Sequence, residues 1–329
     1  MTAHGARADT GAAVQTRAPA RNDVRSLRIP IAILIVLALI APFVVYPVFL
    51  MKMLCWALFA LAFNLLIGYV GLLSFGHALF FGGAAYLTAH AAKEWGVPFE
   101  LAVAIGTATG AVLGLVVGWL AIRRQGIYFA MITLALAQMF YFFCLRAPFT
   151  GGEDGIQGVP RGKLLGVVSL EGNLAMYFVV LAIFLLGFFF VFRVIHSPFG
   201  QVLKAVRENE PRAVSLGYKT DHYKLIAFVL SAALAGLAGG TKAIVFQLAS
   251  LSDVYWTASG EVILMVLLGG LGTVLGPIVG AVVIVCVESF LAELGGWVTV
   301  VQGALFVVCV LAFRRGIIGE LSRVLRRPL

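Results

Sequence analysis

Long apolar runs separated by short polar segments make up most of the chain. A membrane-spanning helix needs roughly 20 mostly apolar residues. The runs predict ten spans, at residues 29–48, 52–70, 75–92, 99–121, 127–144, 174–193, 225–248, 260–272, 277–291 and 297–313. We therefore expect an all-α integral membrane protein with about ten transmembrane helices (8–10). Because several runs are short and rich in glycine, we expect some of these helices to be short or broken.

The composition excludes a soluble globular protein. Hydrophobic residues make up 61% of the 329 positions and charged residues 12%, whereas soluble domains have roughly 45–50% and about 25%. The spans leave no room for a separate soluble domain. The cysteines lie in apolar runs without metal-ligand spacing, at Cys55, Cys144, Cys286 and Cys309. We interpret them as small core residues and predict no metal site.

The polar segments divide the chain into three parts. Residues 1–28 contain almost no large apolar side chains, which predicts a disordered cytoplasmic tail. Residues 29–316 form the predicted transmembrane domain, with a cytoplasmic loop at 194–224, and residues 317–329 form a basic cytoplasmic tail. The first apolar run is too long for a signal peptide, and no small-residue cleavage site follows it. We therefore expect it to remain as the first span.

Basic residues predict the orientation, because cytoplasmic loops of membrane proteins carry an excess of Lys and Arg. With the N-terminus inside, segments 1–28, 123–124, 193–224 and 314–327 are cytoplasmic and hold 18 of the 24 basic residues. Ten crossings fit this distribution and place both termini in the cytoplasm. The net charge of +9 follows from the same bias, and it does not indicate nucleic-acid binding.

The cytoplasmic stretch Ser197–Gly217 carries the signals of two short helices. Ser197 is a predicted N-cap, followed by Pro198 at the first helical position, where no N–H is needed. Pro211 ends the first helix and starts a second of about six residues, which Gly217 stops. Because so short a helix does not persist alone, we expect it to pack on the membrane domain or on a partner. The alternative is a solvated connector.

Two glycine clusters interrupt the apolar runs, one between Gly68 and His77 and one between Gly269 and Pro277. Clustered glycine and proline at membrane depth serve either close helix packing or broken helices that line a cavity or act as gates. Both alternatives stay open. The candidates for the translocation pathway or its gates are Asn64, Ser74, His77, Gln138, Gly269, Gly270, Gly272, Gly276 and Pro277.

Ionisable residues are sparse inside the predicted spans. We interpret His77 as a structural hydrogen-bonding residue, because no second His or Cys stands at metal-ligand spacing. Lys242 and Glu288 lie near the ends of their spans, where we expect their side chains to reach the membrane interface. No span contains two carboxylates, as a proton- or sodium-coupled carrier would usually need.

A second polar excursion, at residues 146–173, faces outside in this topology and contains the glycine-rich stretch Thr150–Gly155. It is either an ordinary extracellular turn or a contact site for an extracytoplasmic partner.

Several motifs, taken in order, resemble those of LivM-type permease subunits of branched-chain amino-acid ABC importers over most of residues 50–316. The matching stretches are Asn64 with Gly68–Ala78, Thr133–Ala135 with Gln138, Thr150–Ile156, Ser197–Glu210 and Gly269–Pro277. The resemblance implies a transport subunit that is not an enzyme. In agreement, the chain contains no Walker-type G-x-x-x-x-G-K-[ST], H-E-x-x-H or G-x-S-x-G motif.

The resemblance also implies a role for the cytoplasmic stretch. ABC permeases carry an E-A-A-x-x-x-G element whose short helix fits a groove on the ATPase subunit. In the aligned residues 211–217, Ala213 and Gly217 match, while the leading Glu is absent. The residues to which the resemblance assigns ATPase coupling are Arg207, Glu208, Glu210, Pro211, Arg212, Ala213 and Gly217.

The partners implied by the resemblance are a periplasmic substrate-binding protein, a sister permease subunit that completes a heterodimer, and two ABC ATPase subunits. The ATPases bind ATP and Mg, so this chain itself needs no cofactor. Transport proceeds by alternating access across the bacterial cytoplasmic (inner) membrane.

The implied substrates are leucine, isoleucine and valine. The alternatives are an importer of the same family for urea, short amides or aromatic acids, and a proton-coupled secondary transporter. A membrane-embedded enzyme is the third class, and the sequence contains no catalytic motif that supports it.

Overall fold

The apolar runs of the sequence form helices throughout the computed structural model, which describes residues 23–164, 166, 168–292, 316–325 and isolated positions between 297 and 307. The long helices are α1 (Asp23–Ile40), α2 (Pro47–Tyr69), α3 (His77–Lys93), α4 (Phe99–Ala121), α5 (Ile127–Arg146), α6 (Asn173–Ile195) and α9 (Thr220–Phe246). The shorter ones are α7 (Pro198–Glu208), α8 (Glu210–Ser215), α10 (Trp256–Gly269), α11 (Gly276–Phe290) and α13 (Gly316–Leu325).

The prediction of an all-α membrane protein is confirmed. Five helices (α2, α4, α5, α6 and α9) are long and apolar enough to cross a bilayer, and α10 and α11 are shorter apolar helices. Each predicted span from 52–70 to 277–291 overlaps one helix, whereas the predicted span 29–48 contains the end of α1, the 3₁₀ turn η1 (Ala41–Phe43) and the start of α2. The last predicted span, 297–313, lies mostly outside the described residues.

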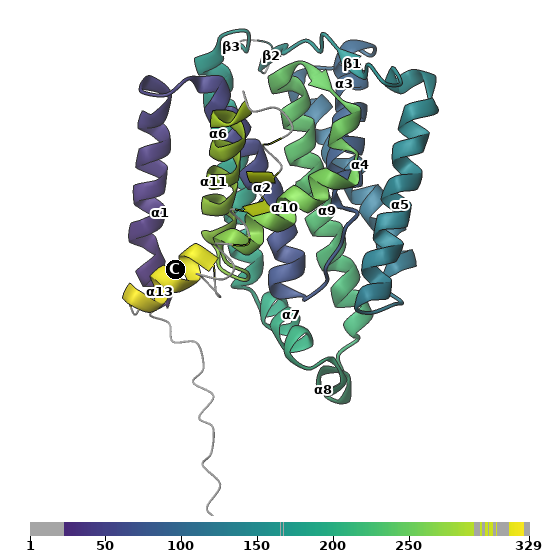
Figure 1. Cartoon of the computed structure of the whole chain (residues 1–329), viewed down its shortest axis with the longest axis vertical. Coiled ribbons are helices and arrows are strands. Elements are labelled where there is room, and N and C mark those ends of the chain that lie inside the picture. Colours follow the sequence, from purple (N-terminus) through teal and green to yellow (C-terminus); the bar gives the residue numbers. More distant parts are fainter. Residues whose placement is uncertain are drawn as a thin grey trace, which may run out of the picture.

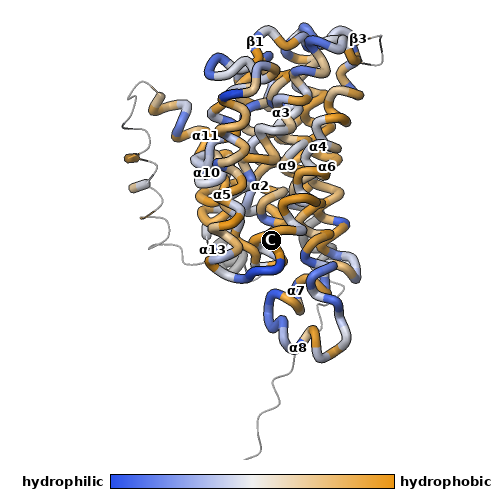
Figure 2. The backbone as a smooth tube through the Cα atoms, turned by 90° about the vertical axis from the view of Figure 1, so that its right-hand side faces the viewer, coloured by the Kyte–Doolittle hydropathy of each residue, from blue (hydrophilic) through white to orange (hydrophobic). Residues whose placement is uncertain are grey.

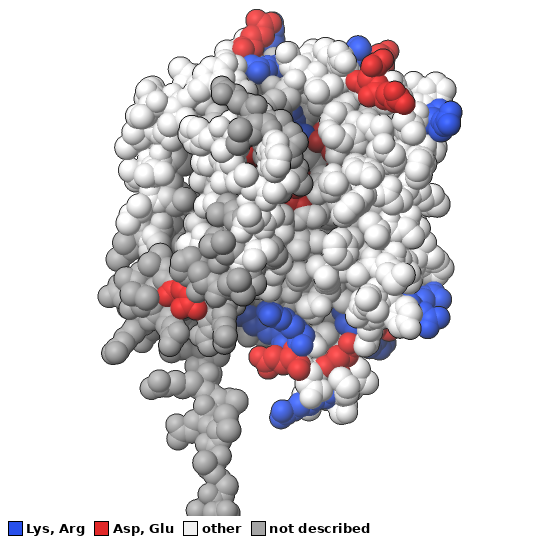
Figure 3. All heavy atoms as spheres, in the orientation of Figure 1, with Lys and Arg blue, Asp and Glu red and all other residues white. Residues whose placement is uncertain are grey.

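The molecule has two polar ends separated by an apolar belt (Figures 1 and 2). The α7–α8 end carries those two helices, and α13 lies toward it (Figure 1). The opposite cap end carries the short strands β1 (Ile156–Gln157), β2 (Lys163–Leu164), β3 (Val168–Ser169) and β4 (Leu248–Ala249). Lys, Arg, Asp and Glu gather at both ends, and most of the surface between them is uncharged (Figure 3).

The core forms around α9, which packs against α2, α3 and α4. Glycine allows α9 and α4 to approach backbone to backbone: a Cβ at Gly110 of α4 would lie 3.0 Å from the Cα of Gly236 in α9. In lipid, helix association depends on such close packing, because the hydrophobic effect does not favour one apolar partner over another. Most of α9 and α2 is buried, whereas most of α5 faces outward.

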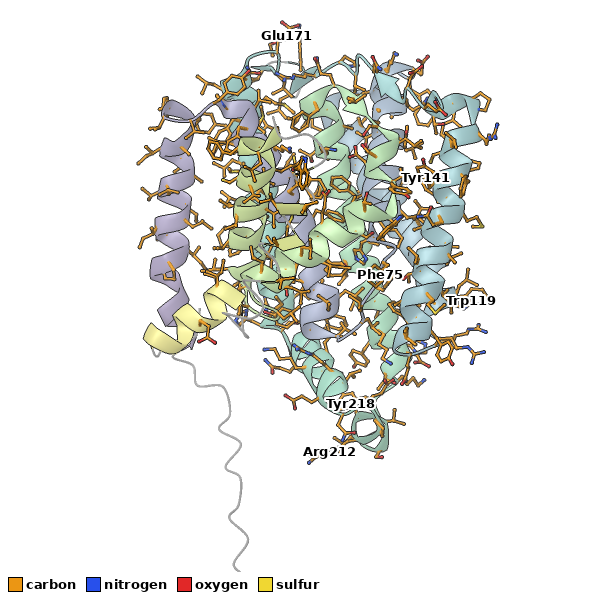
Figure 4. The ribbon with its side chains drawn as sticks, viewed as in Figure 1. Phe75, Trp119, Tyr141, Glu171, Arg212 and Tyr218 are labelled. Atoms are coloured by element: carbon orange, nitrogen blue, oxygen red, sulfur yellow. The ribbon has the colours of Figure 1, made fainter. Side chains whose placement is uncertain are left out.

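Three irregular segments interrupt the helices inside the bundle. Residues 70–76 join α2 to α3, residues 247–255 join α9 to α10 and include β4 and the 3₁₀ turn η3 (Leu251–Asp253), and residues 270–275 join α10 to α11. The first segment runs from the α7–α8 end toward mid-height, where Phe75 is labelled (Figure 4). Residues 247–255 reach deep into the bundle, since a Cβ at Gly82 of α3 would lie 2.7 Å from the nitrogen of Val254.

The polar excursion 146–173 is an ordered cap over this second interruption. Its strand β1 pairs antiparallel with β4, with Ile156 opposite Ala249. Arg161 donates to the carbonyl of Val245 at 3.0 Å and to the side chain of Asn173 at 2.9 Å. The excursion is therefore more than a surface turn, because it fixes the end of α9. Its predicted contact with an outside partner stays a prediction.

Two domain boundaries differ from those expected. Residues 23–28, placed in the disordered tail, are the first turns of α1, because extending a nucleated helix costs little. Residues 317–325, expected as a basic tail, belong to the amphipathic helix α13, which packs on α10 and α11. Its Ile318 is buried. The predicted disorder of residues 1–22 and the tail residues 326–329 lie outside the described residues.

The close approach of α4 and α9 generates a stability prediction. Gly110→Val places a branched side chain against the backbone of Gly236, and overpacking of this kind costs about 1–3 kcal/mol of unfolding free energy. The thermal midpoint in detergent, followed by fluorescence-detected size exclusion, should fall. Gly172→Val is the matched control, because a Cβ at Gly172 has no neighbour within 4 Å. Equal midpoints for the two variants would contradict the packing account.

Candidate functional site

The two predicted cytoplasmic helices exist with the expected caps. Ser197 accepts a hydrogen bond from the Gly200 N–H at 3.3 Å and caps α7, and Asn209 accepts one from the Arg212 N–H at 3.0 Å and caps α8. Gly217 follows with φ of +90°, a left-handed conformation that favours glycine. These local signals are fully readable in the sequence.

Glu210 joins α8 to the membrane domain. Its carboxylate forms an ion pair with Lys224 of α9, which is only 3% exposed. It also accepts hydrogen bonds from Thr220 at 3.1 Å and from Gln125, in the α4–α5 turn, at 3.0 Å. Ala213 is the buried residue of α8. Both residues come from the predicted coupling set, and both face the protein itself.

The remaining surface of α8 forms an exposed tip. Pro211, Arg212 and Gly217 of the predicted set are exposed there, and Arg212 is labelled at this tip in Figure 4. Val214 is 54% exposed and Leu216 70% exposed, well away from the apolar belt. Apolar side chains that project into water beside charged ones are typical of a protein contact surface.

Arg207 connects α7 to two interruptions of the bundle. Its guanidinium donates to the carbonyl of Gly68, in the last turn of α2. It also lies beside Gly272, where a Cβ would be 3.2 Å from Nη1, and beside Gly71, where a Cβ would be 3.1 Å from Cγ. Glu208 lines the cavity of about 370 Å³ next to these residues. Arg207 thus links the α7–α8 end to the segments that begin at Val70 and Gly270.

Asn64 holds the break between α10 and α11 against α2. The fully buried side chain donates to the carbonyl of Thr273 at 2.9 Å and accepts from the N–H of Gly272 at 3.1 Å. Thr273 in turn accepts from the N–H of Gly276 at 3.1 Å. Gly269, Gly270 and Pro277 belong to the same break. Six of the candidates therefore form one junction: Asn64, Gly269, Gly270, Gly272, Gly276 and Pro277.

Ser74 and His77 lie in a second buried junction, at the start of α3. His77 Nε2 is 2.9 Å from the hydroxyl of Ser231 in α9, as its predicted structural role requires. Ser74 accepts from the N–H of Gly76 at 3.2 Å. Rings of three phenylalanines pack edge-on around His77: Phe63, Phe80 and Phe228. Gln138, half-buried on α5, joins neither junction in the described structure.

A charged cavity near the cap end was not expected from the sequence. It has a volume of about 380 Å³, and its walls come from α2, α9, residues 248–253, α10 and α11. Acidic and basic atoms lie in this hollow of the otherwise uncharged belt (Figure 3). The charged residues that line it are Lys52, Lys242, Asp253, Glu261 and Glu288. We call this set the charged cavity.

Two ion pairs occupy the charged cavity. Lys52 Nζ is 3.1 Å from a Glu288 carboxylate oxygen, and Lys242 pairs with Asp253. Both Lys242 and Glu288 therefore have partners inside the cavity, and the expectation that their side chains reach the membrane interface stays a prediction. Lys242 turns inward because an opposite charge on η3 and the rings of Trp56 and Phe81, 5.9 and 5.6 Å from its ammonium, offer partners inside the bundle.

The sequence did contain a signal for this cavity. Glu261 and Lys52 each stand at the edge of a predicted span, and an ionisable residue inside a span is a functional candidate by default. The carboxylates of the cavity come from three different segments, η3, α10 and α11, so no single span contains two of them and reveals the cavity. No three His, Cys, Asp or Glu side chains in the described part of the chain are arranged to hold a metal ion.

The contacts of Glu210 generate a prediction for the α8 corner. Glu210→Gln leaves the buried Lys224 ammonium without its counter-charge, which should cost about 1–3 kcal/mol of local stability. Limited proteolysis of the 209–219 segment in detergent should accelerate. Glu208→Gln is the control, because it removes an exposed carboxylate only two residues away, at the end of α7. Identical cleavage rates in the two variants would refute the anchoring role of Glu210.

Comparison with known proteins identifies the family. The family model described as branched-chain amino acid transport system / permease component matches residues 47–311. The high-affinity branched-chain amino acid transport system permease protein LivM of Escherichia coli K12 is 27% identical over 286 residues, which are 80% of this chain and 67% of that protein. The Salmonella typhimurium LivM protein matches equally well.

More distant relatives share part of the chain. The autoinducer 2 import system permease protein LsrC of Yersinia pseudotuberculosis is 30% identical over 210 residues, 59% of this chain and 54% of that protein. A probable branched-chain amino acid transport permease protein LivM of Methanocaldococcus jannaschii is 27% identical over 199 residues, 58% and 55% of the two chains. No solved structure matches the chain. Because the family model covers well over half of its residues, this chain belongs to the family of branched-chain amino acid transport system permease components.

Proposed function

We propose that this chain is the membrane-spanning permease subunit of an ATP-driven ABC importer for branched-chain amino acids, with ATP hydrolysed by separate subunits. The observation that carries the proposal is the contact of Arg207 with the Gly68 carbonyl and Gly272. It connects the exposed α8 tip to the interruptions of the transmembrane bundle. Family membership supports the same reading.

The proposed mechanism is alternating access without chemistry in this chain. ATPase subunits that bind the α8 tip and close on ATP displace α7 and α8 together. Arg207 then changes its contacts at the end of α2 and at the α10–α11 break. Nucleotide shifts the equilibrium between inward and outward states only through contacts that differ between them. The hydrogen bonds of Asn64 to the same break are the next contacts along this route.

The proposed assembly contains a sister permease subunit, two ABC ATPase subunits and a periplasmic substrate-binding protein. In it, the α7–α8 end faces the cytoplasm of a bacterium, as the excess of basic residues in its loops indicates, and both termini lie on that side of the inner membrane. The cap end, with β1–β4, faces the binding protein.

A different substrate is the main alternative. The LsrC relatives are import permeases for autoinducer 2, and urea, short amides or aromatic acids are further alternatives for this family. A proton-coupled carrier draws support from the three carboxylates of the charged cavity. However, two of these carboxylates are paired with lysines.

The direct test is uptake of labelled leucine into proteoliposomes that contain the chain with its sister permease, ATPases and binding protein. If the proposal is right, the genes of the ATPases and of the binding protein lie beside the gene of this chain. Uptake should require ATP and should persist when an uncoupler collapses the proton gradient at constant ATP. Loss of uptake under the uncoupler would favour the proton-coupled carrier. Uptake of an uncharged ligand alone would overturn the amino-acid assignment.

Arg207 and Arg212 should fail in different ways. Arg207→Ala removes the internal link, so the complex should assemble and hydrolyse ATP while leucine uptake per ATP falls at least about tenfold, a change that corresponds to the loss of one charge-assisted hydrogen bond. Arg212→Glu reverses a charge on the exposed tip and should instead weaken co-purification of the ATPase subunits.

Membrane insertion should stay unchanged in both variants. The melting midpoint should stay unchanged in Arg212→Glu and fall slightly in Arg207→Ala, which loses the hydrogen bond to the Gly68 carbonyl. Lys163→Gln, at the exposed cap end, serves as the control for loss of a positive charge. Normal coupling in Arg207→Ala would show that α7 does not transmit motion to the bundle.

A further inference from the structure

The charged cavity has an uneven set of charges. Two lysines and three carboxylates line it, so their formal sum is one negative charge. Lys242 is committed to Asp253 and Lys52 to Glu288. Glu261 has neither an ion pair nor a hydrogen bond within the described residues, although it lies half-buried in the cavity wall. Lys52 and Lys242 are close enough to act on Glu261 electrostatically, but each forms its contact ion pair with another carboxylate. The direct contact position beside the Glu261 carboxylate is therefore left for an external ammonium group.

Trp56 forms part of the same wall with its ring. It stands one helical turn after Lys52 on α2, so the two residues share one face of that helix. Trp56 is only 6% exposed, and its indole N–H is buried without a hydrogen-bond acceptor in the described structure. The buried N–H does not open into the cavity, so Lys52 is the group on this face that can meet a carboxylate.

The two ion pairs differ in how easily a ligand could replace one partner. In the Lys52–Glu288 pair, the side chains are 26% and 37% exposed, whereas in the Lys242–Asp253 pair they are 16% and 6% exposed. Exposed pairs contribute little to stability, and breaking a buried pair costs far more. Lys52 can therefore exchange Glu288 for a ligand carboxylate, while Lys242 keeps η3 in place.

We propose that the charged cavity is a transit site for the zwitterionic head group of an amino acid. Glu261 receives the ammonium group, and Lys52 receives the carboxylate. The apolar surfaces of Phe246, Leu248 and Ala258, which also line the cavity, accommodate an aliphatic side chain. The cavity volume lies within the roughly 300–1,000 Å³ usual for small-molecule sites.

This inference rests on the proposed importer function and narrows its substrate class. An uncharged ligand would leave the Glu261 carboxylate unpaired in the cavity, and a simple anion would meet a net negative charge. A zwitterion satisfies both ends at once. Among the substrates considered above, an amino acid is therefore favoured over autoinducer 2, urea or a short amide.

The test measures head-group selectivity in the whole complex. Purified complex, without its binding protein, is titrated with labelled leucine in competition with isocaproate, which lacks the ammonium, and isoamylamine, which lacks the carboxylate. Wild type should bind leucine at least about tenfold more tightly than either analogue, since each lost charge-assisted contact is worth about a tenfold change.

Each variant should lose one half of this selectivity. Glu261→Gln should weaken leucine about tenfold without weakening isocaproate, which gains from the lost negative charge. Lys52→Gln should weaken leucine without weakening isoamylamine, which gains from the lost positive charge. A merely structural role would weaken all three ligands in parallel. Glu94→Gln and Lys163→Gln remove the same charges at exposed positions of the cap end and should behave as wild type. Assembly by size exclusion and basal ATPase activity report folding in every variant.

The outcomes separate the two proposals. If wild type transports leucine with ATP while Glu261→Gln binds and transports like Glu94→Gln, the cavity assignment falls and the importer function stands. If wild type neither binds leucine nor transports it but transports an uncharged ligand, the amino-acid substrate and the zwitterion site fall together. Parallel weakening of leucine and both analogues in Glu261→Gln also overturns the site.

Discussion

Every backbone N–H and C=O inside a bilayer needs a partner within the protein, because no water is there to supply one. This constraint governs the three interruptions of the bundle. At 70–76, the hydroxyl of Thr133 accepts from the Phe75 N–H at 3.2 Å. At 270–275, Asn64 serves one N–H and one C=O. At 247–255, the pairing of β1 with β4 does the same. Non-helical backbone exists here because side chains and strands replace the missing helical bonds.

The same partners tie the interruptions to distant parts of the chain. Asn64 forms hydrogen bonds with backbone groups of the α10–α11 break and thereby holds the break to α2. Arg207 donates to the Gly68 carbonyl and lies beside Gly272, and thereby holds α7 to α2 and to the break. Arg161 of the cap binds the carbonyl of Val245 where α9 ends. A movement of α7 and α8 or of the cap therefore cannot leave these backbone groups unchanged. In the proposed mechanism, the contacts that the membrane requires for stability also supply the route for coupling.

Local features could be predicted, and convergent ones could not. Apolar runs locate most of the helices within a few residues, α1 being displaced further, and the caps Ser197 and Gly217 depend on their immediate neighbours, so both features were readable. The candidate junctions were recognised as glycine clusters, but their partners were not, since Asn64 and Thr273 are 209 positions apart. The charged cavity was missed for the same reason. Its residues look like ordinary span ends until the fold brings them together.

Helix α10 lies between the two regions that transport would have to join. Its second turn carries Glu261 into the charged cavity, and its last residue, Gly269, meets the backbone of Gly276 and Gly280 at the break that Asn64 and Arg207 hold. The 14 residues of α10 span about 20 Å at 1.5 Å per residue. A helix of this length is stiff, whereas the glycines that follow it are not. In the proposed mechanism, a tilt imposed at Gly270 and Gly272 would be carried along the whole helix. It would reposition Glu261 against Lys52, and so change the proposed head-group site, without any change in the helix itself.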